Sequence, residues 1–240
     1  MIRADQPTIF GNGVIAAISS RKNGNMKFGL EDEMQTLENR QKFLKEAGLD
    51  IAHTSLIGIT YDTDDFAKYR IVLPSDKGAG MLKAETIEHA DALVTDTPDH
   101  ALFLPLADCV GAILYDEVHH VLMVSHLGRH SIEVSGAAKS VEFLKTHYAT
   151  DPSQLKIWLS PGVGKATYPL RAFDGKGLHE VIISQLLEVG AKKENIEHGA
   201  IDTATTEQYY SHSEFLKGNQ EQAGRFAIVA QMRERGEPAS

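Results

Sequence analysis

The chain of 240 residues contains a single cysteine, Cys109, so it cannot form an internal disulfide, and a reducing compartment is expected. It has no lysine- or arginine-rich run, and its formal net charge of −9 argues against a nucleic-acid-binding surface. Apolar runs long enough to cross a membrane are missing, and the N-terminal segment MIRADQPTIF lacks the apolar core of a signal peptide. We therefore expect a cytoplasmic protein that contacts neither nucleic acid nor membrane.

Internal repeats, low-complexity segments and a Pro/Ser-rich linker are also absent, which favours a single domain. The 42% hydrophobic and 24% charged fractions are ordinary for a globular protein, and the length allows a sizeable core. We expect one domain over residues 1–232, followed by a frayed tail, RERGEPAS, at 233–240.

Short apolar runs separated by turn-like breaks predict more strands than helices. Helical spacing of apolar residues predicts three helices, at 31–48, 131–149 and 176–190. The helices do not alternate regularly with the strands, so the pattern favours an α+β fold with mixed sheets flanked by helices. The region 63–88 is polar and is expected to be mostly loop. The predicted strands are 13–19, 54–62, 91–96, 101–108, 110–116, 120–126, 155–160, 195–202 and 225–232.

The stretch LPLADCVGAILYDEVHHVLMVSHLGRHS, at 104–131, carries the main chemical signal. If 110–116 and 120–126 form a hairpin, its far ends bring Cys109 close to His126. Cysteine and histidine are both zinc ligands, and a histidine can also take the proton of a cysteine to make a nucleophile. A buried packing role for Cys109 remains the third alternative.

Nearly the whole chain resembles the laccase-domain family, whose members are described as multicopper polyphenol oxidases or purine nucleoside phosphorylases. The motifs that carry the resemblance are, in chain order, ISSRKNGN, ENRQKFLKEAGL, DALVT, ADC, SHLGRHS, LSPGVGKATYPL and YYSHSEF…AGRFAIVAQ. The resemblance implies a single mixed α+β domain, an architecture shared with cytotoxic-necrotizing-factor-like cysteine hydrolases.

The resemblance also implies a His–Cys–His zinc site with one open coordination position. Cys109 and His126 match two of the ligands, whereas the segment expected to hold the first histidine reads SLIGITYDTDDF, and Thr60 aligns near the missing ligand. HLGRHS and YSHSEF depart from the family's HAGWRG and YSYRRD. We therefore expect weak or absent zinc, and no copper, because multicopper chemistry needs more ligands than these two.

Several other residues are candidates for the same site. Asp108 could orient a base or a water, and Arg21 and Arg129 could each pair with a phosphate or carboxylate of a small-molecule ligand. His130 and His212 lie in segments that match active-site motifs, so either could supply a third metal ligand. The sequence does not specify an oligomeric state.

Three functions follow as hypotheses. The first is phosphorylase-like, metal-assisted chemistry on a nucleoside or related small molecule, weakened by the missing ligand. The second is a metal-free hydrolase in which Cys109 is the nucleophile and His126 the base. The third is a non-catalytic descendant that binds a small molecule or a partner protein.

Overall fold

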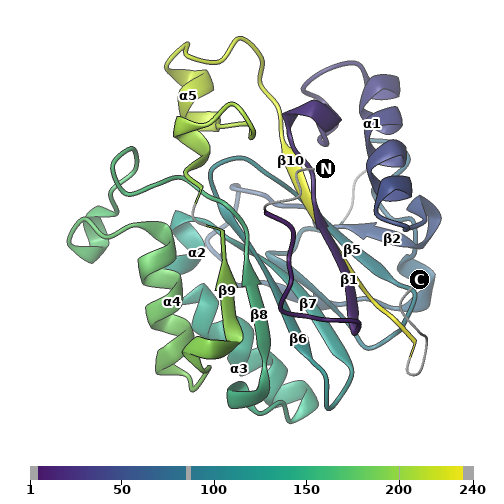
Figure 1. Cartoon of the computed structure of the whole chain (residues 1–240), viewed down its shortest axis with the longest axis vertical. Helices are drawn as coiled ribbons and strands as arrows, with labels where there is room; N and C mark the ends of the chain where they lie inside the picture. The colour runs from purple at the N-terminus through teal and green to yellow at the C-terminus, as the bar shows by residue number, and fades with distance from the viewer. Residues whose placement is uncertain (1–4, 85–87, 200, 235–240) are drawn as a thin grey trace.

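The computed structural model describes residues 5–84, 88–199 and 201–234, in which two β-sheets pack face to face between outer helices (Figure 1). Three strand pairs (β2–β5, β3–β4 and β8–β9) are parallel and the other five are antiparallel, which confirms the mixed α+β prediction. One sheet has the order β1 (Val14–Ile18), β10 (Phe226–Met232), β5 (Ala101–Leu106), β2 (Thr54–Leu56). The other has the order β3 (Tyr69–Ile71), β4 (Ala92–Thr95), β7 (Val121–Leu127), β6 (Val110–Asp116), β8 (Lys156–Leu159), β9 (Ile196–His198).

Strand β6 shows why the sheets stack in layers. Its side chains alternate between the two faces, and all seven residues are buried. Ile113 and Tyr115 pack with residues of the four-stranded sheet, such as Leu104 and Ile228. Ala112 and Leu114 pack instead into the core beneath the helices. Because both faces of β6 are covered, its sequence is a nearly continuous apolar run. A strand buried on both faces holds the polar residues beside it in fixed positions.

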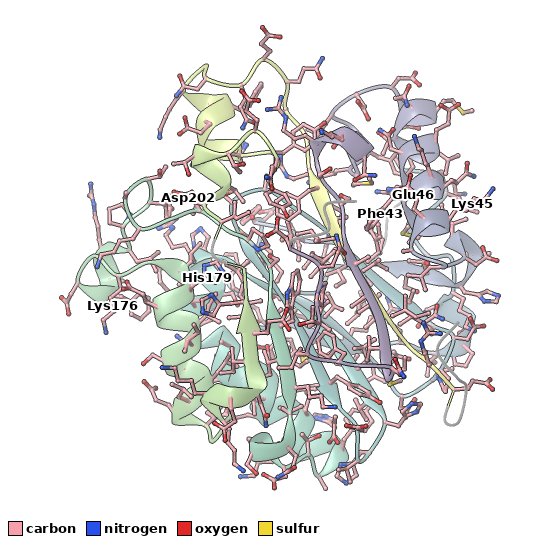
Figure 2. All side chains as sticks on the ribbon, in the orientation of Figure 1. Phe43, Lys45, Glu46, Lys176, His179 and Asp202 are labelled. Atoms are coloured by element: carbon pink, nitrogen blue, oxygen red, sulfur yellow. The ribbon has the colours of Figure 1, made fainter. Side chains whose placement is uncertain are left out.

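The helices cover the outer faces of the two sheets. On the four-stranded sheet, α1 (Glu33–Glu46) packs Phe43 and Leu44 against Phe103, and Figure 2 shows Phe43 beside this sheet. On the six-stranded sheet lie α3 (Gly136–Tyr148) and α4 (Leu178–Glu188). Two short α-helices, α2 (Arg129–Glu133) and α5 (His212–Leu216), are also present. Within the described residues, no helix is long and apolar enough to cross a bilayer.

The prediction of one continuous helix over 131–149 was wrong, because the structure has two helices there, α2 and α3. Ser135, between α2 and α3, adopts a left-handed conformation with φ 61°. The break brings Gly136 against Ser131, where a Cβ on Gly136 would lie 2.0 Å from Ser131 Oγ. This close approach of the two helix ends requires a glycine at position 136. The break lets α2, which begins two residues after β7 ends, run in a different direction from α3.

The strand predicted over 54–62 is also shorter in the structure. Its regular part ends at Leu56, and residues 57–68 form an irregular loop apart from one isolated bridge between Gly58 and His89. The other predicted strands and helices are present with ends shifted by a few residues. Most of the tail expected at 233–240 lies outside the described residues, whereas the backbone N–H of Arg233 bonds to the carbonyl of Gly13.

Candidate functional site

Cys109 lies where the chain crosses from one sheet to the other. It follows β5 of the four-stranded sheet and directly precedes β6 of the six-stranded sheet. The sharp change of direction is made at Asp108, whose φ is 74°. Aspartate tolerates this left-handed conformation better than most residues. The thiol is therefore fixed at the junction of the two layers.

The predicted hairpin brings His126 to the same place. Strands β6 and β7 pair antiparallel, and His126 lies opposite Gly111, two residues after Cys109. Gly128, just beyond β7, contacts both side chains: a Cβ there would lie 2.9 Å from Cys109 Sγ and 3.1 Å from His126 Cε1. The structure thus brings together the two residues that the sequence singled out.

Both side chains open onto a cavity of about 410 Å³, called the main cavity because it is the larger of the two spaces that both residues line. This volume is in the range of pockets that bind small molecules. A smaller side pocket shares Tyr61, Cys109, His126 and Arg129 with it. Besides Cys109 and His126, the main cavity is lined by Lys27, Ile59, Tyr61, Pro105, Leu106, Ala107, Asp108, Arg129, Val163, Tyr168, Leu178, His212, Ser213, Leu216 and Arg225.

Tyr61 is the third side chain that reaches the Cys109–His126 pair. It lines the main cavity and the side pocket with both residues, and its ring meets the His126 ring edge to face, with centroids 6.5 Å apart. The residue is 64% exposed, so it lies at the mouth of the cavity. Thr60, the residue aligned with the missing ligand, instead accepts a hydrogen bond from the backbone of Asp62 in a local turn.

The thiol and the imidazole are both neutral near pH 7. Burial, with a smaller effect from Asp108, raises the pKa of Cys109 to about 11. Burial, with a smaller effect from Lys27, lowers the pKa of His126 to about 4. The Nδ1 atom of His126 is buried and has no hydrogen-bond partner among the described residues. An activated cysteine nucleophile needs a lowered thiol pKa and a base that a third group orients, and neither feature is present.

Asp108 lines the main cavity, but its carboxylate is used in hydrogen bonds. Oδ1 accepts from the Thr203 hydroxyl at 2.9 Å, and Oδ2 accepts from the Ser213 backbone N–H at 2.7 Å. Its backbone carbonyl also accepts from Val163 at 2.8 Å. This geometry lets Asp108 hold three loops around the cavity, a positioning role. The candidate catalytic role remains a prediction.

The two arginines predicted to bind ligand differ in position. Arg129 lines both the main cavity and the side pocket, at the start of α2. It also lies 3.9 Å from a carboxylate oxygen of Glu133, and it is close to the ring of His130. Arg21 lines neither space and instead stacks over the ring of Tyr210, at 5.5 Å.

The two extra histidines considered as ligands both come near the site. His130 lines the side pocket and stacks on Phe66, with ring centroids 4.6 Å apart. His212 begins α5 and lines the main cavity. Neither completes a metal site, because the described residues contain no group of three His, Cys, Asp or Glu side chains that could hold an ion.

Sequence reasoning missed Lys27 and Arg225, which bring positive charge to the main cavity. Burial and the charge of Arg225 lower the pKa of Lys27, and burial lowers the pKa of Arg225. Neither cation makes an ion pair with a carboxylate in the described part of the chain, although Arg225 donates to the Gly224 carbonyl at 2.8 Å. The only sequence signal was the position of Arg225 as the first residue of the strand predicted over 225–232, in a family-like segment.

The donor set does not fit a family-type zinc centre. Zinc at a catalytic site takes about three protein ligands, usually His, Cys, Asp or Glu. Here Cys109 and His126 supply two, and no group of three such side chains that could hold an ion is present among the described residues. A multicopper centre would need still more ligands than these.

Comparison with known proteins decides the family. A family model described as multi-copper polyphenol oxidoreductase laccase matches residues 12–173, well over half of the chain. The chain belongs to this family. Two solved structures have a similar fold although each is under 25% identical to this chain. YlmD from Geobacillus stearothermophilus has a TM-score of 0.84 and 19% identity, with 98% of each chain covered. A hypothetical protein, YfiH, from Bacillus licheniformis has a TM-score of 0.82 and 20% identity, with 92% of this chain and 93% of that chain covered.

One curated relative of this laccase-family chain carries a functional name. It is a purine nucleoside phosphorylase of Clostridium acetobutylicum, 23% identical over 172 residues. The match covers 68% of this chain and 64% of that protein, so the chain spans less than two thirds of the relative's length. The family resemblance seen in the sequence is confirmed, and the nucleoside chemistry of the relative is taken up below.

Proposed function

We propose that the main cavity binds a purine nucleoside or a related small molecule, and that it supports phosphorolysis much more weakly than family members with a complete metal site. The observation that carries this proposal is the convergence of Cys109 and His126 with two cations, Lys27 and Arg225, on one cavity of about 410 Å³. The name of the Clostridium relative indicates the ligand class.

The cations favour an anionic group in the ligand or its co-substrate. Arg225 is half-buried and its positive charge, after burial, lowers the pKa of Lys27, while the Asp108 carboxylate is already bonded to Thr203 and Ser213. A phosphate between Lys27 and Arg225 would offset this repulsion with charge-assisted hydrogen bonds. Arg129, which also lines the cavity, would add a third positive charge.

Aromatic rings at the mouth favour a flat ligand. Tyr61 and Tyr168 line the main cavity and are 64% and 37% exposed. Exposed aromatic rings beside a cavity can stack on a planar base, and such stacking is worth about 1–3 kcal/mol per base in nucleic-acid-binding proteins. A purine base at the mouth and a phosphate near Arg225 would leave the sugar beside Cys109 and His126.

Weak turnover is expected because the reacting end of the site lacks strong chemistry. Its thiol and imidazole are neutral, and its donor set is incomplete for zinc. The metal-free hydrolase hypothesis gains no support from this geometry, for the same reason. The site keeps groups that could bind a ligand and lacks those that would activate one.

The test measures binding and turnover separately. Calorimetry with inosine and adenosine, with and without phosphate, should detect binding that Arg225→Gln weakens at least tenfold. Lys42→Gln, an exposed cation on α1, serves as the control. Nucleoside consumption with phosphate should be far slower than for the Clostridium enzyme. Absence of binding to the folded wild type would refute the proposal, as would robust turnover that survives Cys109→Ala.

A further inference from the structure

The side pocket beside Cys109 and His126 has one carboxylate among its described lining residues, that of Asp91. Asp91 directly precedes β4 and is only 6% exposed. Its Oδ2 accepts a hydrogen bond from the backbone N–H of Lys68 at 3.0 Å, whereas Oδ1 accepts none within the described part of the chain. Aspartate is rarely buried without partners. One oxygen of this carboxylate is therefore left for a hydrogen-bond donor that the described residues do not supply.

Backbone hydrogen bonds fix Asp91 at this position. Its N–H donates to the Lys68 carbonyl at 2.7 Å, and its carbonyl accepts from the N–H of His126 at 2.7 Å. Asp91 is thereby tied to the loop over 57–68 on one side and to β7 on the other. A carboxylate fixed in this way is preorganised for a ligand, because little conformational freedom is lost on binding.

Aromatic rings form much of the wall of the side pocket. Phe66 and His130 stack with ring centroids 4.6 Å apart, and the Tyr61 ring lies 6.2 Å from that of His130. Tyr168 lines the pocket as well. The pocket volume of about 160 Å³ is close to that of a protein cavity of about 150 Å³ that binds one benzene molecule. The side pocket can therefore take one ring of a base, but not a whole nucleoside.

The other charged groups near the pocket do not bond to the Asp91 side chain. Arg129 lines the pocket, but its guanidinium lies 3.9 Å from a carboxylate oxygen of Glu133 and 3.0 Å from a ring nitrogen of His130. Asp65 lies near enough to add negative charge at Asp91. The Asp91 end of the pocket therefore favours a hydrogen-bond donor over a second acceptor.

The main cavity differs from the side pocket in charge. It is lined by Lys27 and Arg225, and by Asp108, whose carboxylate already accepts hydrogen bonds from two protein donors. None of these three residues lines the side pocket. Tyr61 lines both spaces, so a base that lies against Tyr61 could point one edge toward Asp91 while a phosphate stays beside the two cations.

We propose that the side pocket is a subsite for the edge of a planar base that carries an amino group, and that Asp91 is the acceptor that selects this edge. The inference rests on the proposed function, because it takes the ligand to be a nucleoside, and it names the bases that the site prefers. An amino group would make a charge-assisted hydrogen bond to the carboxylate. A base without an N–H at this edge would leave the buried oxygen without a partner, so it binds less tightly.

Nucleosides that differ only at the base edge test the proposal on the wild type. Purine riboside has no N–H on its base, whereas adenosine and 2-aminopurine riboside each add one amino group, at different positions. Calorimetry in the presence of phosphate should show that at least one of the two amino nucleosides binds about tenfold or more tightly than purine riboside, which is the gain expected from one hydrogen bond to a charged group.

Asp91→Asn tests the acceptor itself. The Lys68 N–H would hold the amide oxygen, so the amide NH₂ would face the ligand and oppose its amino group. The preference for the amino nucleoside should fall about tenfold or more, while the affinity for purine riboside changes by less than about threefold. Asp50→Asn is the matched control, because this carboxylate also accepts a backbone N–H, from Ala52 at 2.9 Å, and lines neither space. It should leave the preference unchanged, and circular dichroism verifies that both variants fold.

The ratio of the two affinities separates selection of the base from support of the fold. An equal loss of affinity for the amino nucleoside and for purine riboside in Asp91→Asn would overturn the proposal and make Asp91 a structural residue. Equal binding of all three nucleosides to the wild type would overturn it without any variant, and would leave the proposed function standing. Failure of the wild type to bind any nucleoside would instead refute the proposed function, and this inference with it.

Discussion

The backbone N–H of Ser213 donates a hydrogen bond to Asp108 Oδ2 at 2.7 Å, across 105 residues of sequence. The second carboxylate oxygen holds Thr203, so one side chain joins the sheet crossover to two distant loops. Hydrogen bonds to a charged group contribute about 1.5–3 kcal/mol each. Asp108→Ala should therefore lower the free energy of unfolding by about 3 kcal/mol, as measured by urea denaturation.

Asp108→Asn separates a positioning role from a catalytic one. Its amide oxygen can still accept one of the two hydrogen bonds, so it should recover part of the stability and of the ligand affinity lost in Asp108→Ala. A wild-type-like unfolding midpoint for Asp108→Ala, with turnover abolished, would instead support the catalytic role predicted from the sequence.

Gly128 is the point of closest contact beside the Cys109–His126 pair. A Cβ there would lie 2.9 Å from Cys109 Sγ, closer than real side chains pack. Gly128→Ala should push the sulfur or the imidazole aside, weaken nucleoside binding at least tenfold and destabilise the fold by about 1–3 kcal/mol. Calorimetry and urea denaturation measure the two effects.

Gly177→Ala is the matched control for this change. Gly177 also precedes a helix, with a negative φ of −82°, and a Cβ there would lie 3.2 Å from Lys165 Cβ, outside the main cavity. It should leave nucleoside affinity unchanged. Equal loss of binding in the two variants would mean that the effect of Gly128→Ala comes from the helix N-terminus and not from the site.

The sequence predicted best what depends on local pattern. The apolar runs at 110–116 and 120–126 are buried on both faces, and their short turn allows little besides a hairpin, so the approach of Cys109 to His126 could be inferred without a structure. The break between α2 and α3 could not, because the apolar spacing continues through it. It depends on a left-handed Ser135 and a close turn contact at Gly136.

Residues that reach the site from irregular segments were missed for a related reason. Tyr61 lies in the loop over 57–68, where no periodic pattern indicates which side chain points inward, and a shift of one residue separates it from Thr60. Lys27 and Arg225 are distant in sequence and meet only through the packing of the four-stranded sheet. Charge composition gave no hint of them, since the chain as a whole is acidic.

Two buried histidines should make the protein sensitive to acid. The pKa values of His100 and His126 are each lowered from 6.5 to about 4, mainly by burial. Between these values the unfolded chain binds protons that the folded protein does not, so stability falls as the pH drops from 6.5 to 4 and is unaffected by these groups above 6.5. Each contributes a slope of up to about 1.4 kcal/mol per pH unit.

Urea denaturation at several pH values measures this slope. His126→Asn should flatten it, whatever its effect on absolute stability, whereas His147→Asn, which changes an exposed histidine on α3, should not. An unchanged slope in His126→Asn would show that the buried imidazole is not the group that takes up the proton.

The reactivity of Cys109 distinguishes a buried thiol from a nucleophile. Because its pKa is about 11 instead of 9, its thiolate population near pH 8 is about 100-fold smaller than that of an ordinary cysteine. A thiolate of higher pKa is intrinsically more reactive, which offsets part of this difference.

Iodoacetamide should therefore alkylate Cys109 in the native protein at least about tenfold more slowly than in the urea-unfolded protein. Mass spectrometry measures the rate of alkylation. Because the chain has one cysteine, every adduct reports on Cys109. Faster labelling of the native protein, with a midpoint below pH 8, would reveal an activated thiolate and revive the cysteine hydrolase hypothesis.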